Sequence, residues 1–249
     1  MRALVILPTY NELGNLGPLM ESIIEQGEMF DVLIIDDGSP DGTGLLADHL
    51  KTVYPNRVEV IHRQGKLGLA TAYLTGFRYG LNKGYDYMFE MDADFSHNPH
   101  YLPEFIQTMV REKADVVLGS RYVSGGGATR WPWYRRLISR GGSMYAGLML
   151  GLSIRDLTGG FKCFSRRVLE AMNLETIEST GYGFQIEMTY RAVRSGFKVA
   201  EMPIIFEERR EGKSKMSPGI FAEALWMVGK LRLESGMEGD RRPADERLR

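Results

Sequence analysis

The sequence has very little cysteine and no long apolar run. Cys163 is the one cysteine in 249 residues, so the chain has no partner for an internal disulfide and a reducing compartment is expected. The longest apolar stretch, Tyr145–Ile154, is much shorter than the roughly 18–20 residues that a membrane-spanning helix needs. Met1 and Arg2 lead directly into an apolar run without a secretory cleavage site. We therefore expect a cytoplasmic protein that does not cross a membrane but can still touch one.

The chain also lacks an excess of positive charge. Its 31 Lys and Arg residues and 32 Asp and Glu residues give a formal net charge of -1. This balance excludes a broadly basic nucleic-acid-binding protein, and no nucleic-acid partner is expected. Apolar residues make up 43% of the chain, which is enough to form the core of a folded domain.

Short apolar runs alternate with longer segments of helical periodicity in the first half of the chain. The strand-like runs are Arg2–Leu7, Asp31–Asp36, Val58–His62, Asp86–Met91 and Asp115–Gly119. The helical segments are about Asn15–Gln26, Thr43–Val53, Leu69–Asn82 and Tyr101–Glu112. This order predicts a Rossmann-like α/β fold, with a mostly parallel sheet covered by helices on both faces. Because such sheets bind ligands beyond the carboxyl ends of their strands, polar residues there are the candidates for chemistry.

The alternation ends after Arg121. A glycine run at 125–127 and a Trp-Pro-Trp segment at 131–133 are typical of a loop. The following pattern predicts a helix near Arg135–Leu152, strands near Phe161–Phe164 and Val199–Phe206, and a helix near Phe184–Arg194. In the first of these helices Tyr145, Met149 and Leu152 have helical spacing, and we interpret them as core residues.

The last helical pattern covers Ser217–Glu234. Its apolar residues at near-helical spacing are Ile220, Phe221, Ala224, Leu225, Val228 and Leu231. They fit either core packing or an interfacial helix that lies on a bilayer. No linker or repeat interrupts the chain, so residues 1–235 are expected to form one domain. The charged tail, residues 236–249, is expected to be disordered.

An acidic motif follows the fourth predicted strand. Asp92 and Asp94 flank Ala93, so both side chains point the same way in an extended segment. Two convergent carboxylates repel each other unless a cation neutralises them. A hard divalent ion such as Mg²⁺ or Mn²⁺, shared with substrate phosphates, meets that need. In isolation the motif also fits a solvated turn, but polar motifs at the ends of two neighbouring strands favour a metal site.

One long segment contains arginines and no acid. From Val116 to Ile154 there is no Asp or Glu, and the segment contains Arg121, Arg130, Arg135, Arg136 and Arg140. The guanidinium fork matches phosphate oxygens in bidentate fashion, so the segment suits an anionic ligand. It also suits a basic face near anionic lipid headgroups, and the two interpretations are compatible.

Several ordered motifs resemble the large inverting glycosyltransferase family with the GT-A fold. They are LPTYNE (Leu7–Glu12), IDDGSPDGT (Ile35–Thr43), MDADFSH (Met91–His97), GSRY (Gly119–Tyr122), DLTGGFKCF (Asp156–Phe164), GYGFQIEM (Gly181–Met188) and FEERREGKSKM (Phe206–Met216). Within that family they are most similar to the dolichyl- or polyprenyl-phosphate mannose synthases. The resemblance runs from about residue 4 to residue 230 and implies the GT-A fold over the whole domain.

The resemblance implies roles for individual residues in donor binding. Pro8, Tyr10, Glu12, Ile35 and Asp37 are expected to hold the donor nucleoside. Asp92, Ala93 and Asp94 are expected to meet the diphosphate, with the metal on Asp92 and Asp94. Arg209 and Lys215 are expected to reach over the donor phosphates. For Glu12, a carboxylate at a helix N-terminus is the alternative. Ser96 stands where some relatives place a glutamine metal contact, which leaves a third protein ligand open.

The same resemblance implies that Arg121, Arg135 and Ser139 hold the phosphate of the acceptor. Asp94, Arg121 and Arg209 are the expected catalytic residues. A phosphomonoester is already anionic at pH 7, because its second pKa is about 6, so no general base is expected to be indispensable.

The expected function is transfer of mannose from GDP-mannose to a polyprenyl (dolichyl-type) phosphate, with inversion at the sugar. The expected cofactor is Mg²⁺ or Mn²⁺, and the expected location is the cytoplasmic face of a membrane, as a peripheral protein. One alternative is a polyprenyl-phosphate glucosyl- or other glycosyltransferase that uses a UDP-sugar. Another is a nucleotide-binding regulator without turnover, which the presence of both Asp92 and Asp94 disfavours.

Overall fold

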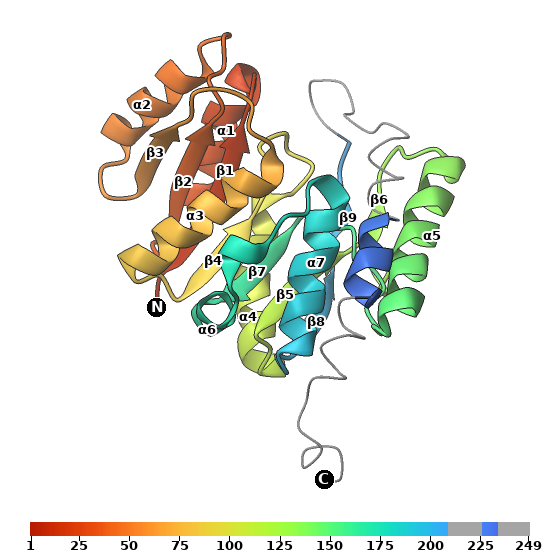
Figure 1. The fold of residues 1–249 in the computed structure, drawn as a ribbon. Coiled ribbons are helices and arrows are strands. Elements are labelled where there is room, and N and C mark those ends of the chain that lie inside the picture. The colour runs from red at the N-terminus through yellow and green to blue at the C-terminus, as the bar shows by residue number, and fades with distance from the viewer. Residues whose placement is uncertain (209–225, 234–249) are drawn as a thin grey trace.

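A seven-stranded sheet forms the centre of the protein (Figure 1). The computed structural model describes residues 1–208 and 226–233. The strands in chain order are β1 (Ala3–Thr9), β2 (Phe30–Asp36), β3 (Val58–His62), β4 (Tyr87–Glu90), β5 (Val116–Ser120), β7 (Lys162–Ser165) and β8 (Val199–Pro203). Their order across the sheet is β3-β2-β1-β4-β7-β5-β8. All neighbours are parallel except β7, which runs antiparallel to both β4 and β5. The predicted mostly parallel sheet is therefore confirmed.

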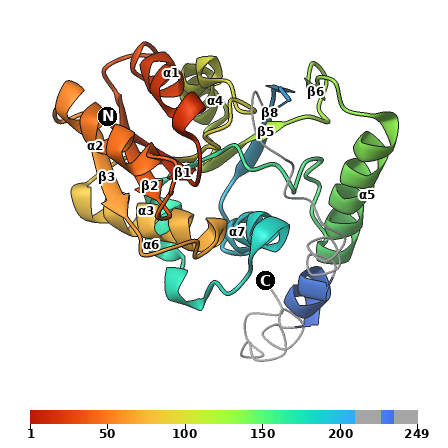
Figure 2. The same cartoon turned by 90° about the horizontal axis from the view of Figure 1, so that it is seen from above.

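The helices cover both faces of this sheet (Figure 2). Those that contribute to its two faces are α1 (Leu13–Ile24), α2 (Thr43–Val53), α3 (Leu69–Lys83), α4 (Leu102–Glu112), α6 (Arg166–Ala171) and α7 (Gly181–Arg194). Alternate residues of β1 point to opposite faces, as the twofold period of a strand requires. Val5 and Leu7 pack with α1, α2 and α4, whereas Leu4 and Ile6 pack with α3, α6 and α7. Two apolar cores, one on each face, hold the sheet between its helices.

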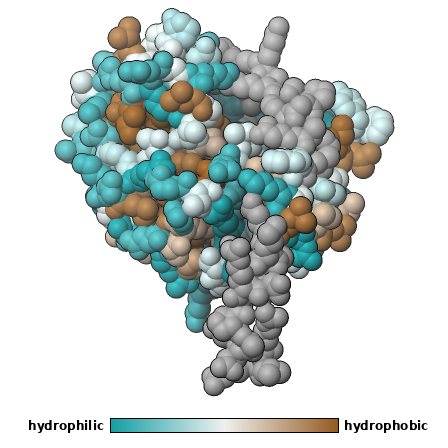
Figure 3. All heavy atoms as spheres, viewed as in Figure 1, coloured by the Kyte–Doolittle hydropathy of each residue, from teal (hydrophilic) through white to brown (hydrophobic). Residues whose placement is uncertain are grey.

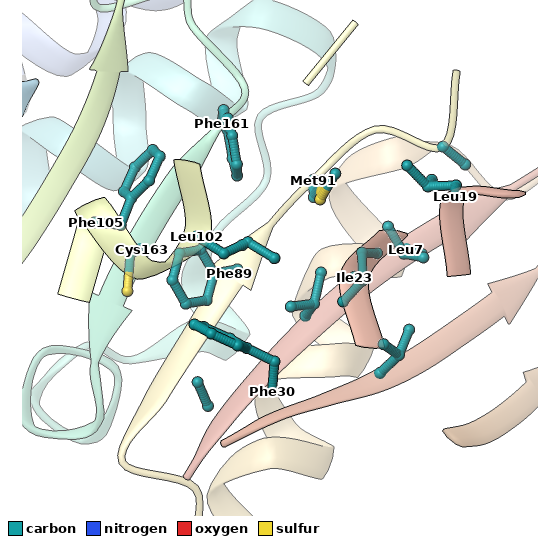
Figure 4. Packing of buried hydrophobic residues seen from close by; sticks show 14 of the residues in the cluster. Leu7, Leu19, Ile23, Phe30, Phe89, Met91, Leu102, Phe105, Phe161 and Cys163 are labelled. Atoms are coloured by element: carbon teal, nitrogen blue, oxygen red, sulfur yellow. The ribbon is translucent and has the colours of Figure 1, made fainter. Parts of the chain in front are cut away.

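Aromatic rings fill the middle of the first core (Figure 4). The Phe89 ring lies edge-on to Phe30, with centroids 6.1 Å apart, and edge-on to Phe105 at 5.6 Å. Cys163 is buried in the same cluster. On the other face α3 lies very close to β1, because a Cβ on Gly76 would be 2.6 Å from Ile6 Cγ2. A larger residue at 76 would push α3 away from the sheet.

The chain reverses its direction across the sheet between β1 and β4. From β1 it proceeds to β2 and β3 on one side, and α3 then returns it to β4 on the other side of β1. A crevice forms at such a switch point, beyond the carboxyl ends of the two strands. The LPTYNE and MDADFSH motifs follow these two strands, so the topology brings them together.

The segment after β5 differs in part from the prediction. The loop that begins with Gly125 contains a short strand, β6 (Gly127–Ala128), paired in parallel with β9 (Ile205–Phe206). The predicted strand Val199–Phe206 is therefore two strands, β8 and β9, in different sheets. Glycine at 126 also lets this loop pass close to the end of β5, since a Cβ there would lie 2.4 Å from the Ser120 carbonyl oxygen.

A long helix, α5 (Trp133–Leu150), stands at one side of the molecule (Figure 1). Its buried residues are Ser143, Ala146, Gly147 and Leu150. Ala146 and Leu150 pack in a third cluster with Ile186 and Tyr190 of α7 and with Met227, Val228 and Leu231 of the helix at 226–233. The assignment of Tyr145 and Met149 to the core was wrong, because they are 36% and 38% exposed. Small residues, and not these larger ones, form the face of α5 that contacts the domain.

The helix at 226–233 lies within the predicted segment Ser217–Glu234 and is confirmed over that range. Val228 and Leu231, from the apolar pattern, are buried, which supports core packing for this part of the segment. Ile220, Phe221, Ala224 and Leu225 lie outside the described residues, as does the tail 236–249. Within the described ranges, no helix combines the length and the apolar character needed to cross a bilayer.

Candidate active site

A cavity of about 470 Å³ opens beyond the carboxyl ends of β1 and β4. Its wall includes the predicted residues Pro8, Tyr10, Glu12, Asp37, Asp92, Ala93, Asp94, Arg121 and Arg135. The expected donor-binding and acceptor-binding motifs, which are far apart in sequence, thus border the same space. Ile35 and Ser139 are not part of the wall. Arg209 and Lys215 lie outside the described residues.

The acidic motif at the end of β4 is held by hydrogen bonds to both of its aspartates. Asp94 is buried, and its Oδ1 accepts a hydrogen bond of 3.0 Å from the Ser96 backbone N–H. Phe95 has φ 64°, and this left-handed turn lets Ser96 fold back onto Asp94. The Asp92 N–H donates to His97 Nδ1 at 3.0 Å, and its Oδ1 accepts from the Tyr73 hydroxyl at 3.3 Å. Hydrogen bonds within the chain therefore orient both aspartates.

Two carboxylates in one cavity suit a divalent cation that the protein holds only in part. Asp92 and Asp94 both line the cavity, and their oxygens are the hard ligands that Mg²⁺ and Mn²⁺ prefer. Within the described residues, no group of three or more His, Cys, Asp or Glu side chains is placed to hold a metal. The Ser96 hydroxyl is buried without a hydrogen-bond partner among those residues. The donor set thus fits an ion that completes its coordination with substrate phosphates and water.

Asp37 forms a buried ion pair at the donor end of the cavity. Its Oδ1 accepts from Arg63 Nε at 2.6 Å, and both side chains are less than a tenth exposed. Arg63 also donates to the Thr71 hydroxyl at 2.7 Å, which ties it to the first turn of α3. Lys66 Nζ lies 4.9 Å from the centre of the Tyr10 ring, where a cation is attracted to the ring face. These contacts fix the residues that were expected to surround the nucleoside.

Glu12 stands at the start of α1 and also at the wall of the cavity. It occupies the N-cap position of α1, at the positive end of the helix dipole, and it also lines the cavity. Its Oε2 accepts a hydrogen bond of 2.8 Å from Asn15 Nδ2, and its N–H donates to the Thr43 hydroxyl at 2.9 Å.

Arg121 is held by an aspartate that the sequence analysis did not consider. Its Nε and Nη2 each donate to a different oxygen of Asp156 at 2.7 Å, and its backbone N–H donates to the same carboxylate at 2.9 Å. Asp156 is fully buried and Arg121 is 8% exposed. Burial alone would raise the pKa of Asp156, but the guanidinium outweighs burial and keeps that pKa below its usual value. The charge of Arg121 is therefore largely balanced within the protein.

Arg135 differs from Arg121 in having a buried donor without a partner. Its Nε is buried and makes no hydrogen bond within the part of the chain that the structure describes. The guanidinium lies 4.3 Å from the centre of the Trp131 ring, and that of Arg121 lies 5.2 Å from the same ring. Trp131 is 7% exposed and stands between the loop after β5 and the start of α5. It holds two guanidinium groups beside one wall of the cavity.

Two predicted residues lie away from the wall. Ile35 is fully buried in β2 and packs in the core cluster on the α3 face of the sheet. Ser139 is half-buried on α5, one turn after Arg135 and close to the Tyr122 hydroxyl. Burial raises the pKa of Tyr122, which Arg121 and then Ser139 oppose. Ser139 thus lies among the residues around Arg121, whereas the side chain of Ile35 packs in the core and does not face the cavity.

Two buried residues of opposite charge lie on neighbouring strands beside the acidic motif. Glu90 of β4 and Lys162 of β7 are paired across the antiparallel ladder, and both are fully buried. Lys162 Nζ donates to the Gln185 carbonyl at 2.6 Å and to the Thr189 hydroxyl at 2.9 Å. Burial raises the pKa of Glu90 and lowers that of Lys162, and their attraction opposes both shifts. Lys162 thus ties β7 to α7, the helix whose first residues, Gly181 and Tyr182, line the cavity.

Comparison with known proteins supports, over most of the chain, the family resemblance found in the sequence. The family model described as "Glycosyl transferase family 2" matches residues 4–172. The polyprenol monophosphomannose synthase of Mycolicibacterium smegmatis is 46% identical over 229 residues, which are 92% of this chain and 86% of that protein. The undecaprenyl-phosphate mannosyltransferase of Micrococcus luteus is 46% identical over 243 residues, covering 96% of this chain and 97% of that protein.

Solved structures with the same fold are more distant in sequence. Glucosyl-3-phosphoglycerate synthase from Mycobacterium tuberculosis, in complex with phosphoglyceric acid, has a TM-score of 0.68 at 17% identity, covering 92% of this chain and 79% of that one. The same enzyme in complex with Mn²⁺, UDP-glucose and phosphoglyceric acid has a TM-score of 0.66 at 19% identity, with 92% and 80% covered. These likenesses confirm the predicted GT-A fold. With the family model over most of the domain and two relatives at 46% identity, the chain belongs to glycosyl transferase family 2.

Proposed function

We propose that this protein transfers mannose from GDP-mannose to a polyprenyl phosphate, with inversion at the anomeric carbon. The observation that carries the proposal is the single cavity lined by both the Asp92–Asp94 carboxylates and the Arg121 and Arg135 side chains. A transfer between two phosphate-bearing substrates needs cationic groups for both, because the phosphates repel each other. The names of the two relatives at 46% identity, a polyprenol monophosphomannose synthase and an undecaprenyl-phosphate mannosyltransferase, support the same donor sugar and acceptor class.

Each group of residues has a distinct task in this proposal. Asp92 and Asp94 hold Mg²⁺ or Mn²⁺, which when bound stabilises the charge of the departing GDP. Tyr10, Glu12 and Asp37 hold the nucleoside, and Arg135 uses its unpartnered Nε for the acceptor phosphate. Arg121 keeps Trp131 and Arg135 in place, since its guanidinium lies 5.2 Å from the centre of the Trp131 ring. Arg209 and Lys215 are proposed to cover the donor phosphates.

The acceptor needs positioning more than it needs a base. At pH 7 a phosphomonoester is largely dianionic, since its second pKa is about 6, so one of its oxygens can attack directly. Holding that oxygen in line with the anomeric carbon can lower the barrier by several kcal/mol, since well-oriented reactants gain up to about 7–11 kcal/mol. A divalent ion for the donor side is also consistent with the distant structural relative that was solved with Mn²⁺ and UDP-glucose.

A donor competition tests the proposed activity against a UDP-sugar transferase. We expect radiolabel from GDP-mannose to enter polyprenyl phosphate in the presence of Mg²⁺ or Mn²⁺, with kcat/KM at least tenfold higher than for UDP-glucose. The Arg135→Ala variant should raise KM for the lipid phosphate about tenfold or more, since a charge-assisted hydrogen bond is lost. A preference for UDP-glucose would reject the proposed donor. Nucleotide binding without any transfer would instead favour a regulator.

We also propose that α5 rests on the membrane that holds the lipid acceptor. Its side away from the domain carries Trp133, Leu137, Met144 and Leu148, which are 64–78% exposed and follow one another at helical spacing. The exposed Arg136 and Arg140 lie on the same helix and suit anionic headgroups. Figure 3 shows brown side chains at the edge of the molecule where α5 lies. The cavity wall continues directly into this helix through Trp131 and Arg135.

Vesicle binding tests this membrane contact. The Leu137→Glu/Leu148→Glu variant should bind vesicles containing anionic lipid at least tenfold more weakly than the wild type, because each leucine loses about 1.5–3 kcal/mol of burial in the membrane. Both positions are exposed, so the melting temperature should stay unchanged. Leu45→Glu on α2, where Leu45 is 78% exposed, is the matched control. Equal loss of binding in the control, or wild-type binding that is insensitive to salt, would contradict a peripheral contact through α5.

A further inference from the structure

A buried phenol on α3 contacts one of the two proposed metal-binding carboxylates. Tyr73 is fully buried, and its hydroxyl donates to Asp92 Oδ1 at 3.3 Å. Among the described residues it is the one side chain that donates a hydrogen bond to this carboxylate. Asp94, in contrast, takes a backbone N–H from its own turn, at Ser96. The orientation of the Asp92 carboxylate thus depends on a residue from another element.

The surroundings of Tyr73 hold the phenol in one position. Its ring stacks on Phe184 of α7, with centroids 6.2 Å apart and an angle of 5° between the planes. The helix that carries it lies against β1 at the close approach of Gly76 to Ile6. A phenol has an ordinary pKa of about 10, so at pH 7 the hydroxyl carries its proton and acts as the donor to Asp92.

We propose that Tyr73 is a positioning residue that orients Asp92 for the divalent cation. The inference rests on the proposed function, in which Asp92 and Asp94 are the protein ligands of the metal. With Oδ1 hydrogen-bonded to the phenol, Oδ2 is left for the ion, and rotation of the carboxylate is restricted. The described residues contain no group of three or more side chains placed to hold a metal. With only Asp92 and Asp94 as proposed ligands, the orientation of each carboxylate has a large effect on metal affinity. Partners of this kind typically change metal affinity 10–100-fold.

The test compares two variants that each lose one buried phenolic hydroxyl. In Tyr73→Phe the ring remains to stack on Phe184, and the hydrogen bond to Asp92 is lost. In Tyr85→Phe a similar bond is lost, because the Tyr85 hydroxyl donates to Asp31 Oδ2 at 3.0 Å in a buried site at the other end of the strands. Binding of Mn²⁺ to the complex of protein and GDP is measured by electron paramagnetic resonance, without turnover. GDP binding in EDTA is measured alongside.

We expect Tyr73→Phe to weaken Mn²⁺ binding about tenfold or more, while Tyr85→Phe binds Mn²⁺ as the wild type does. GDP binding in EDTA should be the same for all three proteins, and excess Mn²⁺ should restore most of kcat in Tyr73→Phe. In an Asp92→Asn background the Tyr73→Phe change should have no further effect on Mn²⁺ affinity, which shows that the phenol acts through Asp92 and not through packing. For this comparison, Asp92→Asn and Asp92→Asn/Tyr73→Phe should have the same melting temperature, so that a difference in folding does not affect the measured Mn²⁺ affinity.

Wild-type Mn²⁺ affinity in Tyr73→Phe would overturn the inference, as would an equal loss in Tyr85→Phe or an undiminished effect in the Asp92→Asn background. The proposed function can fail separately. A wild-type protein that binds Mn²⁺ with GDP but transfers no mannose would reject the proposed reaction, while the comparison between Tyr73→Phe and Tyr85→Phe would still decide the role of Tyr73.

Discussion

Replacing Asp94 by alanine is expected to lower kcat/KM for mannose transfer about 10³-fold or more. The change removes one of two carboxylates that hold the cation, and the departing diphosphate loses the charge that stabilises it. Chelation of the wild-type protein should have the same effect, and added Mn²⁺ should reverse it. Mannose transfer to polyprenyl phosphate, measured with and without EDTA, provides the comparison.

Two controls separate this effect from loss of folding. Asp94→Asn keeps the side-chain shape and the oxygen that accepts the Ser96 N–H, so it should fold normally and still lose most activity. Asp48→Asn removes a carboxylate that is 56% exposed on α2 and bonded to His62, and it should retain full activity. An Asp94→Ala protein with more than a tenth of wild-type activity would contradict a metal site at this motif.

Replacing Asp156 by alanine is expected to destabilise the protein by about 3–5 kcal/mol. Arg121 would remain buried with its main counterion removed and three hydrogen bonds lost. For a domain of this size each 1 kcal/mol corresponds to a shift of about 2–4 °C in melting temperature, so the melting temperature should fall by roughly 10 °C. Breaking the exposed pair Lys51–Glu59 by Lys51→Ala should change stability by less than about 1 kcal/mol. Calorimetry of the three proteins gives the comparison.

Removing both partners distinguishes two roles of Arg121. The double variant Arg121→Met/Asp156→Leu buries no unpaired charge, so most of the lost stability should return. Transfer activity should not return, because the Arg121 guanidinium that keeps Trp131 and Arg135 in place is gone. Full activity in the double variant would mean that Arg121 only stabilises the fold. Arg135 would then bind the acceptor phosphate without any contribution from Arg121.

The parallel part of the sheet could be predicted because its signals are local. Each apolar run from β1 to β4 is followed by a helix of clear periodicity, and the strands were expected within a few residues of their observed bounds. The antiparallel entry of β7 between β4 and β5 could not be predicted in this way. That placement depends on tertiary pairs such as Glu90 with Lys162, which no local pattern reveals.

The exposed face of α5 shows a second limit of prediction from the sequence. Helical spacing identifies which residues share a face, but it does not say which face meets the domain. Tyr145 and Met149 were assigned to the core on their apolar character, whereas the domain contacts Ala146, Gly147 and Leu150. Small residues allow close packing of helices, and the larger apolar ones are then left outside.

The candidate site was predicted best where residues follow strands. Tyr10, Asp37, Asp92 and Asp94 border one cavity, because parallel strands place their carboxyl ends at the same edge. Asp156 was missed although the arginines were noted, because it lies two residues beyond the acid-free segment Val116–Ile154. A buried arginine requires a nearby counterion, so the first acid after that segment was a usable signal. Tyr73 gave no such signal, since its role depends on the approach of α3 to β4.

The most direct test of the account is whether the phosphate of the lipid is the group that receives the sugar. Wild-type protein is supplied with labelled GDP-mannose and Mn²⁺, and with either a polyprenyl phosphate or the corresponding polyprenol. We expect label to enter the phosphorylated lipid as a β-linked mannosyl phosphate, with transfer to the alcohol at least 10³-fold slower, because the cavity offers cationic groups for a second phosphate and the reaction uses no general base. Comparable transfer to the alcohol, or a product with the α configuration, would contradict it.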